Sequence, residues 1–173
     1  KDGLTDVYNK VHMGNCAELC AKEHNISRTD QDNFAIESYK RASAAWEQGK
    51  FLDEVVPVAV PQRKGDPKIV DCDEEYKNVF LDKIPNLRPA FDKEGTITAA
   101  NASTLNDGAS CLLLASEEAV QKHGLSPIGK IISYADAAHE PEWFTTAPSK
   151  AVPKALAKAD LSVSDVDYWE LNQ

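Results

Sequence analysis

The hydrophobic and polar positions of the first fifty residues follow a helical period. Asn15, with Glu18 three residues later, forms a capping-box pair that predicts a helix running to about His24. A second, longer helix is predicted over residues 27–48, with Ser27 as its N-cap. The larger side chains of this second stretch recur at the spacing of one helix face: Ile36, Tyr39 and Trp46.

After Phe51 the pattern changes to that of β-structure. Residues 55–60 are a run typical of a strand, and Pro57 within it favours an edge position. Residues 68–70 are expected to pair back onto this strand across a polar turn. Residues 71–88 are mostly charged and irregular, with too little continuous apolar sequence for a core. We therefore expect this middle portion to be an insertion that lies on a larger domain.

The second half of the chain alternates apolar runs with short helical stretches. Strands are predicted at residues 109–116, 129–135 and 166–171, and helices at residues 117–123 and 148–159. Strands that alternate with helices favour a parallel or mixed sheet covered by helices. The sequence therefore predicts an α/β fold.

Between these halves lies a stretch that is poor in side-chain bulk. Residues 96–110 read Thr-Ile-Thr-Ala-Ala-Asn-Ala-Ser-Thr-Leu-Asn-Asp-Gly-Ala-Ser. Small side chains leave main-chain amides and carbonyls open to close approach by a ligand or an ion. The segment from Asn106 to Gly108 is a turn signal. The plainer interpretation is a loop between two strands, and both interpretations stand on these residues alone.

Length and composition exclude some classes of function. The 173 residues suffice for one domain or one and a half, and 42% hydrophobic with 27% charged residues is ordinary for a soluble protein. No apolar run approaches the roughly 18 residues that a membrane span needs. A net charge of −9 disfavours sequence-independent binding to nucleic acid. We therefore expect neither a membrane nor a nucleic-acid partner.

The four cysteines suggest neither a disulfide framework nor a zinc site. Cys16 and Cys20 are four residues apart, and only His12 and His24 lie near enough to complete a metal site. Small buried thiols are the more common outcome for such residues. Nothing else in the sequence is typical of a secreted, disulfide-bonded protein.

Several separated segments share their wording with one enzyme family. Residues 98–109 read Thr-Ala-Ala-Asn-Ala-Ser-Thr-Leu-Asn-Asp-Gly-Ala, and further matches occur at residues 2–14, 74–77, 134–138 and 169–172. These motifs resemble the thiolases, which make or cleave 3-ketoacyl-CoA. Within that family the wording is most similar to the branch of mitochondrial acetoacetyl-CoA thiolases (acetyl-CoA acetyltransferases). The matches span nearly the whole chain.

The resemblance implies a fragment of the thiolase fold, in which an α+β loop domain is inserted in a layered α/β/α core that is incomplete here. Residues 1–95 would form the loop domain that binds coenzyme A. Residues 96–147 would end the N-terminal core domain, and residues 148–173 would begin the C-terminal one. Both ends of the sequence are expected to be cuts through a larger fold.

The parent reaction implied is the condensation of two acetyl-CoA into acetoacetyl-CoA and CoA. The family's nucleophilic cysteine motif would precede this chain, and its base cysteine and Gly-His-Pro motif would follow it. The resemblance therefore predicts an acyltransferase segment that is inactive alone. Asn172 matches an asparagine that orients a water in the oxyanion hole, while Gln173 replaces the family's glutamate. The alternative is a non-catalytic CoA-binding or subunit-interaction module.

Two sets of ligand residues are carried over from the family. Asn78 stands where the mitochondrial branch of the family has an arginine. This departure puts a tight contact with the nucleotide in doubt. A potassium ion held by neutral oxygens is implied at Tyr39, Ala99, Ala100 and Ala102. Contacts with coenzyme A are implied for His12, Met13, Tyr39, Asn78, Val79, Phe80, Lys83 and Ser103.

Each of these residues also has a simpler structural role. His12 suits a half-buried position, Met13 can fill a core, and Ser103 can be a turn hydroxyl. The remaining expectations follow from the family alone. They are acyl-CoA substrates, a homodimer or homotetramer for the full-length parent, and a mitochondrial location, with a cytoplasmic one as the alternative.

Overall fold

The computed structural model describes residues 2–106 and 109–172, and its chain divides into two compact units. One unit comprises Ala17–Ala102, and the other comprises Lys1–Cys16 with Ser103–Gln173. Helix α1 (Met13–Glu23) crosses the boundary between them. Among the described residues, no helix combines the length and the apolar character needed to cross a bilayer.

Helix α1 begins two residues before the predicted capping pair. The His12 side chain provides the cap, because its Nδ1 accepts a hydrogen bond from the Gly14 amide at 3.0 Å. Glu18 is not engaged in a capping box at Asn15, since its carboxylate bonds main-chain amides 78 and 79 residues further along the chain. The predicted helix is confirmed, and the predicted cap is wrong.

Helix α2 (Arg28–Glu47) agrees closely with its prediction. Ser27 is the N-cap, and its Oγ accepts from the Asp30 amide at 3.1 Å while the Asp30 carboxylate accepts from the Ser27 amide. Gln48 is the C-cap, and Gly49 follows with a φ of +67°, a conformation that favours glycine. Local sequence signals therefore suffice to define both ends of this helix.

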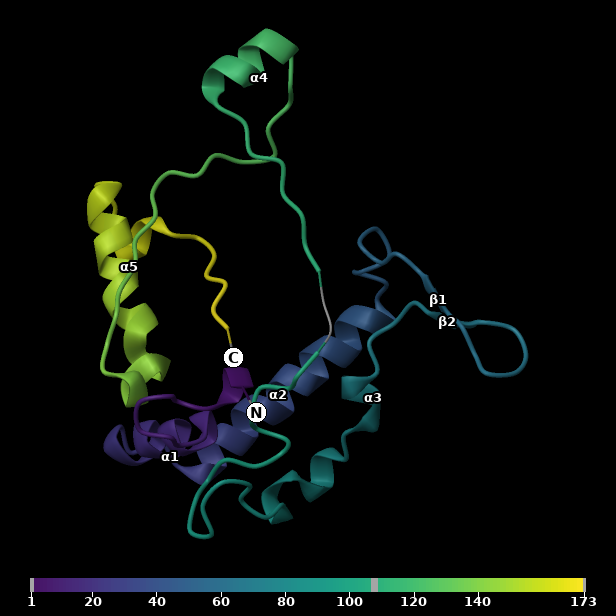
Figure 1. Cartoon of the computed structure of the whole chain (residues 1–173), viewed down its shortest axis with the longest axis vertical. Helices are drawn as coiled ribbons and strands as arrows, with labels where there is room; N and C mark the ends of the chain where they lie inside the picture. Colours follow the sequence, from purple (N-terminus) through teal and green to yellow (C-terminus); the bar gives the residue numbers. More distant parts are fainter. Residues whose placement is uncertain (1, 107–108, 173) are drawn as a thin grey trace. The chain divides into compact units, whose positions relative to one another are not determined.

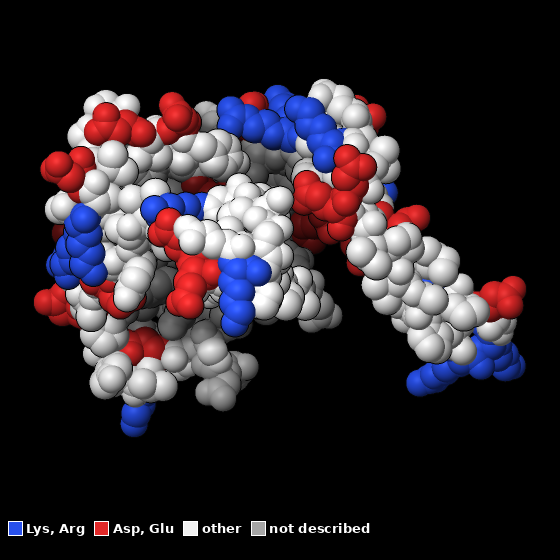
Figure 2. Space-filling model, turned by 90° about the horizontal axis from the view of Figure 1, so that it is seen from above, with Lys and Arg blue, Asp and Glu red and all other residues white. Residues whose placement is uncertain are grey.

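The predicted strand pair is confirmed as an antiparallel hairpin, drawn in Figure 1. Strand β1 (Val58–Val60) pairs with β2 (Lys68–Val70) in the register Val58 to Val70 and Val60 to Lys68. All six residues of these two strands are exposed to solvent. Figure 2 shows basic side chains at the far end of this arm, where the turn contains Arg63 and Lys64.

The stretch after β2 was predicted to be irregular and without a core, and the structure corrects this. It contains α3 (Glu75–Asn78) and the 3-10 helix η2 (Leu81–Asn86), and both pack against α2. Ile84 of η2 is fully buried. A single apolar side chain on a short helical turn is enough to reach the core, although a search for continuous apolar runs misses it. The remaining buried residues of this unit are Ala21, Asp32, Ala35, Ile97, Thr98 and Ala100.

In the other unit, the predicted helices form but the predicted strands do not. Helix α4 (Glu117–His123) ends at Gly124 in the left-handed conformation, and α5 (Ala147–Lys158) follows the 3-10 helix η3 (Pro141–Thr146). Two further 3-10 turns, η1 (Asp2–Leu4) and η4 (Val163–Asp165), complete the elements. The chain on both sides of α4 is extended (Figure 1).

The three predicted strands are wrong for this chain. Within residues 2–106 and 109–172, strand pairing is confined to the β1–β2 hairpin and one bridge between Thr5 and His12. Leu112, Leu113 and Leu114 are 84%, 90% and 73% exposed. A strand needs a neighbouring strand that is hydrogen-bonded to it, and these apolar runs have no such partner strand among the described residues. Asp107 and Gly108 of the predicted turn, and Gln173, lie outside the described residues.

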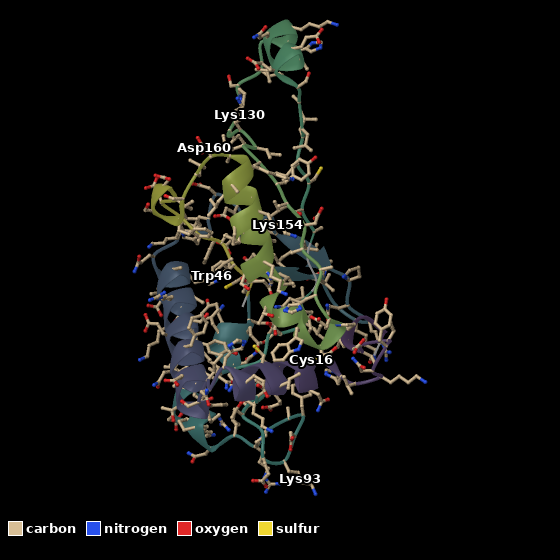
Figure 3. All side chains as sticks on the ribbon, turned by 90° about the vertical axis from the view of Figure 1, so that its left-hand side faces the viewer. Cys16, Trp46, Lys93, Lys130, Lys154 and Asp160 are labelled. Atoms are coloured by element: carbon tan, nitrogen blue, oxygen red, sulfur yellow. The ribbon has the colours of Figure 1, made fainter. Side chains whose placement is uncertain are left out.

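One of the extended runs lies along α5, held by side chains of that helix. Lys158 donates to the Tyr134 carbonyl at 2.9 Å, and Ser133 donates to the Ala155 carbonyl at 2.7 Å. Lys154, labelled in Figure 3, donates to the Asp136 carbonyl. The two lysines bond main-chain carbonyls of the extended segment, whereas Ser133 bonds a carbonyl of the helix. The segment is therefore extended without being a strand.

Candidate functional site

The side-chain-poor stretch folds into a tight bend over residues 96–102, and a carboxylate from α1 holds its start. Glu18 Oε2 accepts from the Thr96 amide at 2.8 Å, and Glu18 Oε1 accepts from the Ile97 amide at 2.8 Å. The Thr96 hydroxyl donates to the same carboxylate at 3.1 Å. Hydrogen bonds to a charged acceptor are stronger than neutral ones. One carboxylate therefore binds three donors at the start of the bend.

Helix α2 holds the other side of the bend. Asn101 Nδ2 donates to the buried Asp32 Oδ1 at 3.0 Å and to the Thr96 carbonyl at 3.0 Å, while its Oδ1 accepts from the Thr98 amide at 2.7 Å. Gln31 Nε2 donates to the Thr96 hydroxyl at 2.9 Å. Asn101 thus satisfies its amide group within the bend and ties the bend to α2.

Thr98 forms the centre of the bend and is completely buried. Its Oγ1 accepts from the Ala100 amide at 3.3 Å and from the Asn101 amide at 3.4 Å, and its carbonyl accepts from the Ala102 amide at 3.0 Å. Across the described part of the chain, no buried side-chain nitrogen or oxygen lacks a hydrogen-bond partner. The bend is consequently a hydrogen-bonded element of the fold. The sequence alone also allowed a plain loop between two strands.

A second network extends from Asp32 to the end of η2. Arg28 Nε donates to Asp32 Oδ2 at 2.7 Å, and Arg28 Nη2 donates to the carbonyls of Ile84 at 2.9 Å and Leu87 at 3.0 Å. Arg28 thereby neutralises the buried carboxylate and closes the end of η2 at the same time. Sequence reasoning missed Glu18, Gln31, Arg28 and Asp32 as positioning residues, because only folding brings them to the bend.

The residues predicted to bind potassium all belong to the unit Ala17–Ala102. In the bend, Ala99 is exposed, Ala100 is buried and Ala102 is half-buried, while Tyr39 is half-buried on α2. Burial, with a further contribution from the Glu75 charge, raises the pKa of Tyr39, so its phenol stays protonated. In the part of the chain that the structure describes, no cluster of three or more His, Cys, Asp or Glu could hold a metal ion. A cation here would depend on neutral oxygens.

Part of the predicted coenzyme A set lies on the two short helices that pack against α2. Asn78 ends α3 and is exposed, and Val79 follows it half-buried. Phe80 is 64% exposed, and Lys83 Nζ lies 4.2 Å from the centroid of its ring. This cation–π contact keeps an ammonium next to an exposed aromatic face. The structure therefore brings Phe80 and Lys83 together, as a contact with a ligand's charged and aromatic groups would require.

The remaining predicted residues belong to the other unit. His12 precedes α1 and forms the bridge with Thr5, and Met13 is the half-buried first residue of that helix. Ser103 is exposed directly after the bend, and Asn172 is exposed near the C-terminal end of the described chain. His12 thus has a structural role as a cap, whatever else it contacts.

Cys16 is the most buried of the four thiols, with 2% of its surface exposed. Burial raises the pKa of Cys16, and the nearby carboxylates of Asp6 and Glu142 add to the effect. A thiol of this kind is poorly suited to nucleophilic chemistry, which needs a thiolate.

Comparison with known proteins agrees with this arrangement. A model described as "Thiolase, N-terminal domain" matches residues 1–118, and one described as "Thiolase, C-terminal domain" matches residues 125–173. The chain belongs to the thiolase family. The resemblance inferred from the Asn-Ala-Ser and Asn-Asp-Gly-Ala wording is therefore confirmed.

Curated thiolases named as acetyl-CoA acetyltransferases match the entire chain. The chain is 52% identical to "Acetyl-CoA acetyltransferase A, mitochondrial" of Xenopus laevis and covers 41% of that protein. It is 54% identical to the acetyl-CoA acetyltransferase of Schizosaccharomyces pombe and covers 44% of it. The chain thus spans about two-fifths of the length of these relatives, which are acyltransferases by name.

Solved thiolase structures match the fold. The Acat5 thiolase from Ascaris suum, determined in complex with coenzyme A, has a TM-score of 0.92 at 46% identity, with 100% of this chain and 44% of that chain covered. The acetyl-CoA acetyltransferase of Bacillus anthracis has a TM-score of 0.89 at 36% identity, with 96% and 42% covered. The predicted fold class, a fragment of the thiolase fold, is confirmed.

Proposed function

We propose that this chain is the coenzyme A-binding segment of an acetyl-CoA C-acetyltransferase. The parent reaction joins two acetyl-CoA into acetoacetyl-CoA and CoA. One observation carries the proposal: the whole chain matches proteins named as acetyl-CoA acetyltransferases at 52% to 54% identity. The proposed substrates are acyl-CoA thioesters, and the proposed location is mitochondrial, as in several relatives by name, with the cytoplasm as the alternative.

Coenzyme A is proposed to bind the residues that the family resemblance assigns to it. His12 and Ser103 would contact the pantetheine arm, and Met13 would limit the length of the acyl chain. Tyr39 would also contact the ligand. The nucleotide end would lie near Asn78, Val79, Phe80 and Lys83. The Lys83 ammonium beside the exposed Phe80 ring supports the second part, because it offers a cation to phosphate and an aromatic face to a base. The relative from Ascaris suum was solved with coenzyme A, which supports the ligand class.

A potassium ion is proposed at Tyr39 and the carbonyl oxygens of Ala99, Ala100 and Ala102. The hydrogen bonds of Glu18, Asn101 and Thr98 support this proposal, since they fix a bend whose main chain small side chains leave open. The protonated phenol of Tyr39 would add a neutral oxygen. The ion would order the bend and take no part in chemistry.

The chain alone is proposed to be inactive. The resemblance implies that none of its four cysteines falls on a catalytic motif, and burial raises the pKa of Cys16. Asn172 would supply only the water-orienting part of the oxyanion hole. The proposed division into a loop domain (residues 1–95) and two partial core domains (residues 96–147 and 148–173) agrees with this role.

Two measurements test the proposal. Titration of the 173-residue chain with coenzyme A should give tighter binding in potassium than in sodium buffer, and equal affinities would refute the potassium site. In a thiolysis assay with acetoacetyl-CoA, we expect no turnover. Sustained turnover would refute the claim that the catalytic groups are missing.

The second candidate is a non-catalytic module that joins thiolase subunits. The exposed runs of Leu112–Leu114 and Ile131–Ile132 favour it, because apolar surface of this extent is typical of interaction sites. Mixing the chain with a full-length homologous enzyme and measuring mass by light scattering distinguishes the two. A mixed oligomer supports this module, whereas unchanged masses with coenzyme A binding support the first candidate. A dimer or tetramer is proposed for the full-length parent.

A further inference from the structure

A thiol and an amine lie side by side on the surface of the unit Ala17–Ala102. Lys77 Nζ donates a hydrogen bond to Cys72 Sγ at 3.0 Å. The Tyr76 hydroxyl is 3.5 Å from the same sulfur. Cys72 is half-buried between β2 and α3, and Lys77 is exposed on α3. Two nucleophilic groups at this distance form a pair that the proposed ligand sites do not use.

Aromatic packing fixes this pair in place. The Tyr76 ring stacks on Trp46 of α2, with centroids 6.3 Å apart and an angle of 12° between the planes, and Lys77 Nζ lies 5.5 Å from the Tyr76 centroid. Figure 3 labels Trp46 on α2, which itself packs against α3. The first turn of α3 is therefore anchored to a long helix, and the thiol and the amine keep their proximity.

We propose that Cys72 and Lys77 form a site of acyl modification, in which Cys72 takes an acyl group from an acyl-CoA thioester and passes it to Lys77. The inference goes beyond the proposed function and rests on it only for the presence of acyl-CoA. The neighbouring ammonium donates a hydrogen bond to the sulfur, whose thiolate form is the nucleophile that attacks.

The chemistry proceeds in two balanced steps. In the first, the Cys72 thiolate attacks the carbonyl carbon of the thioester, a new carbon–sulfur bond forms, and the bond to CoA breaks, so that CoA leaves as a thiolate. In the second, Lys77 loses a proton to solvent and its amine attacks the carbonyl carbon of the Cys72 thioester. The carbon–nitrogen bond forms, the carbon–sulfur bond to Cys72 breaks, and the second proton of the nitrogen passes to the departing thiolate or to solvent, so that Cys72 is regenerated. The net change converts a lysine ammonium and acyl-CoA into an amide, free CoA and a proton.

The electrostatics favour this order of events. The hydrogen bond to Cys72 raises the pKa of Lys77, so the amine remains an ammonium while the sulfur is free. Acylation of the sulfur weakens this hydrogen bond and with it the largest cause of the shift. The amine then loses its proton more readily, within reach of the thioester carbonyl. Proximity supplies the rate advantage, as in other intramolecular transfers.

The test uses the full 173-residue chain with acetyl-CoA at about pH 8, where an ordinary thiol begins to lose its proton. Digestion and mass spectrometry then follow the modification over time. Lys77 should be acetylated at least about tenfold faster than Lys93, an exposed lysine at the outer end of a loop in Figure 3. In Cys72→Ser the rate at Lys77 should fall to that of Lys93. In Cys111→Ser, which removes an exposed thiol elsewhere, the rate should not change.

Lys77→Arg provides a second, independent readout, because an acetyl group should then remain on Cys72 as a thioester that hydroxylamine removes. This variant also decides the matter if Cys72→Ser does not fold. An unchanged rate at Lys77 in folded Cys72→Ser, or no thioester in Lys77→Arg, would overturn the proposal. S-acetyl-N-acetylcysteamine as a donor without a nucleotide should also acetylate Lys77. A failure of coenzyme A binding in the titration above is thus separate from a failure here.

Discussion

The bend at residues 96–102 and the apolar run at residues 109–116 have opposite fates, although only six residues separate them. The bend is small and polar, yet Thr98 at its centre is completely buried and its hydroxyl accepts hydrogen bonds from two main-chain amides. The run is rich in leucine, yet Leu113 is 90% exposed. Hydrophobicity alone does not decide which segment is ordered. A segment is ordered when its backbone groups find partners, and side chains supply them for the bend whereas neighbouring strands would have to supply them for the run.

The largest effect on stability is expected when the carboxylate that holds the bend is removed. We expect Glu18→Ala to lower the free energy of unfolding by about 3 kcal/mol, because two partly buried amides and a hydroxyl lose a charged acceptor. Urea denaturation measures the change. Glu23→Ala, at the exposed end of the same helix, is the matched control and should stay within about 0.5 kcal/mol. Equal losses of stability would show that a change in helix α1 itself, and not the loss of the hydrogen bonds from Glu18 to the bend, is responsible.

Arg28→Lys should cost about 2 kcal/mol, since an ammonium cannot serve Asp32 and the carbonyls at the end of η2 together. Arg41→Lys is the control, because Arg41 also pairs with a carboxylate four residues away, Glu37, but on an exposed surface. We expect almost no change there in the same denaturation experiment. A small effect at Arg28 would mean that η2 is held by packing of Ile84 alone.

A single methyl group can distinguish the packed region from the open one. At Gly95 an added Cβ would lie 2.2 Å from Glu18 Oε1 and 3.0 Å from the Asp92 carbonyl oxygen, so Gly95→Ala should cost about 1–2 kcal/mol. At Gly129, in an extended segment, an added Cβ meets nothing within 4 Å. Gly129→Ala should leave the urea midpoint unchanged. A comparable loss at both glycines would contradict the contrast drawn here.

Thiol chemistry provides a pH-dependent test. The raised pKa of Cys16 means that the folded chain keeps this proton to higher pH than the unfolded chain, so any stabilisation is present at low pH and lost as pH rises through the folded pKa. At mildly alkaline pH, iodoacetamide should modify Cys16 at least about tenfold more slowly than the exposed Cys111. In urea the two rates should converge. Equal rates in the folded chain would contradict the burial of Cys16.

The smallest effect on stability is expected in the apolar run itself. Leu113→Ser should change the free energy of unfolding by less than about 0.5 kcal/mol, because the side chain is already in contact with water. The same substitution should reduce binding of a hydrophobic dye and slow aggregation. Ile84→Ala, which empties a fully buried site, provides the opposite reference. A clear loss of stability in Leu113→Ser would mean that the run is packed in solution.

The parts of the fold that the sequence predicted are those with local causes. Ser27 and Asp30 define the start of α2, Gly124 ends α4, and the β1–β2 pair forms across its own turn. The strands at residues 109–116, 129–135 and 166–171 could not be predicted correctly in this way, since pairing depends on other segments. The family was recognisable from short motifs, whereas the side chains that fix the bend were not, because Glu18 has the same pattern as a helix-capping residue.

The hydrogen bonds that hold the bend at residues 96–102 have a consequence for how this region folds. Its hydrogen bonds join residues 65, 69 and 78 positions apart in the sequence, through Gln31, Asp32 and Glu18. Loops of that length close slowly relative to the formation of a single helix turn. We therefore expect α1 and α2 to form before their side chains bind the bend. The amide protons of Thr96 and Ile97 should then gain protection from exchange late in refolding.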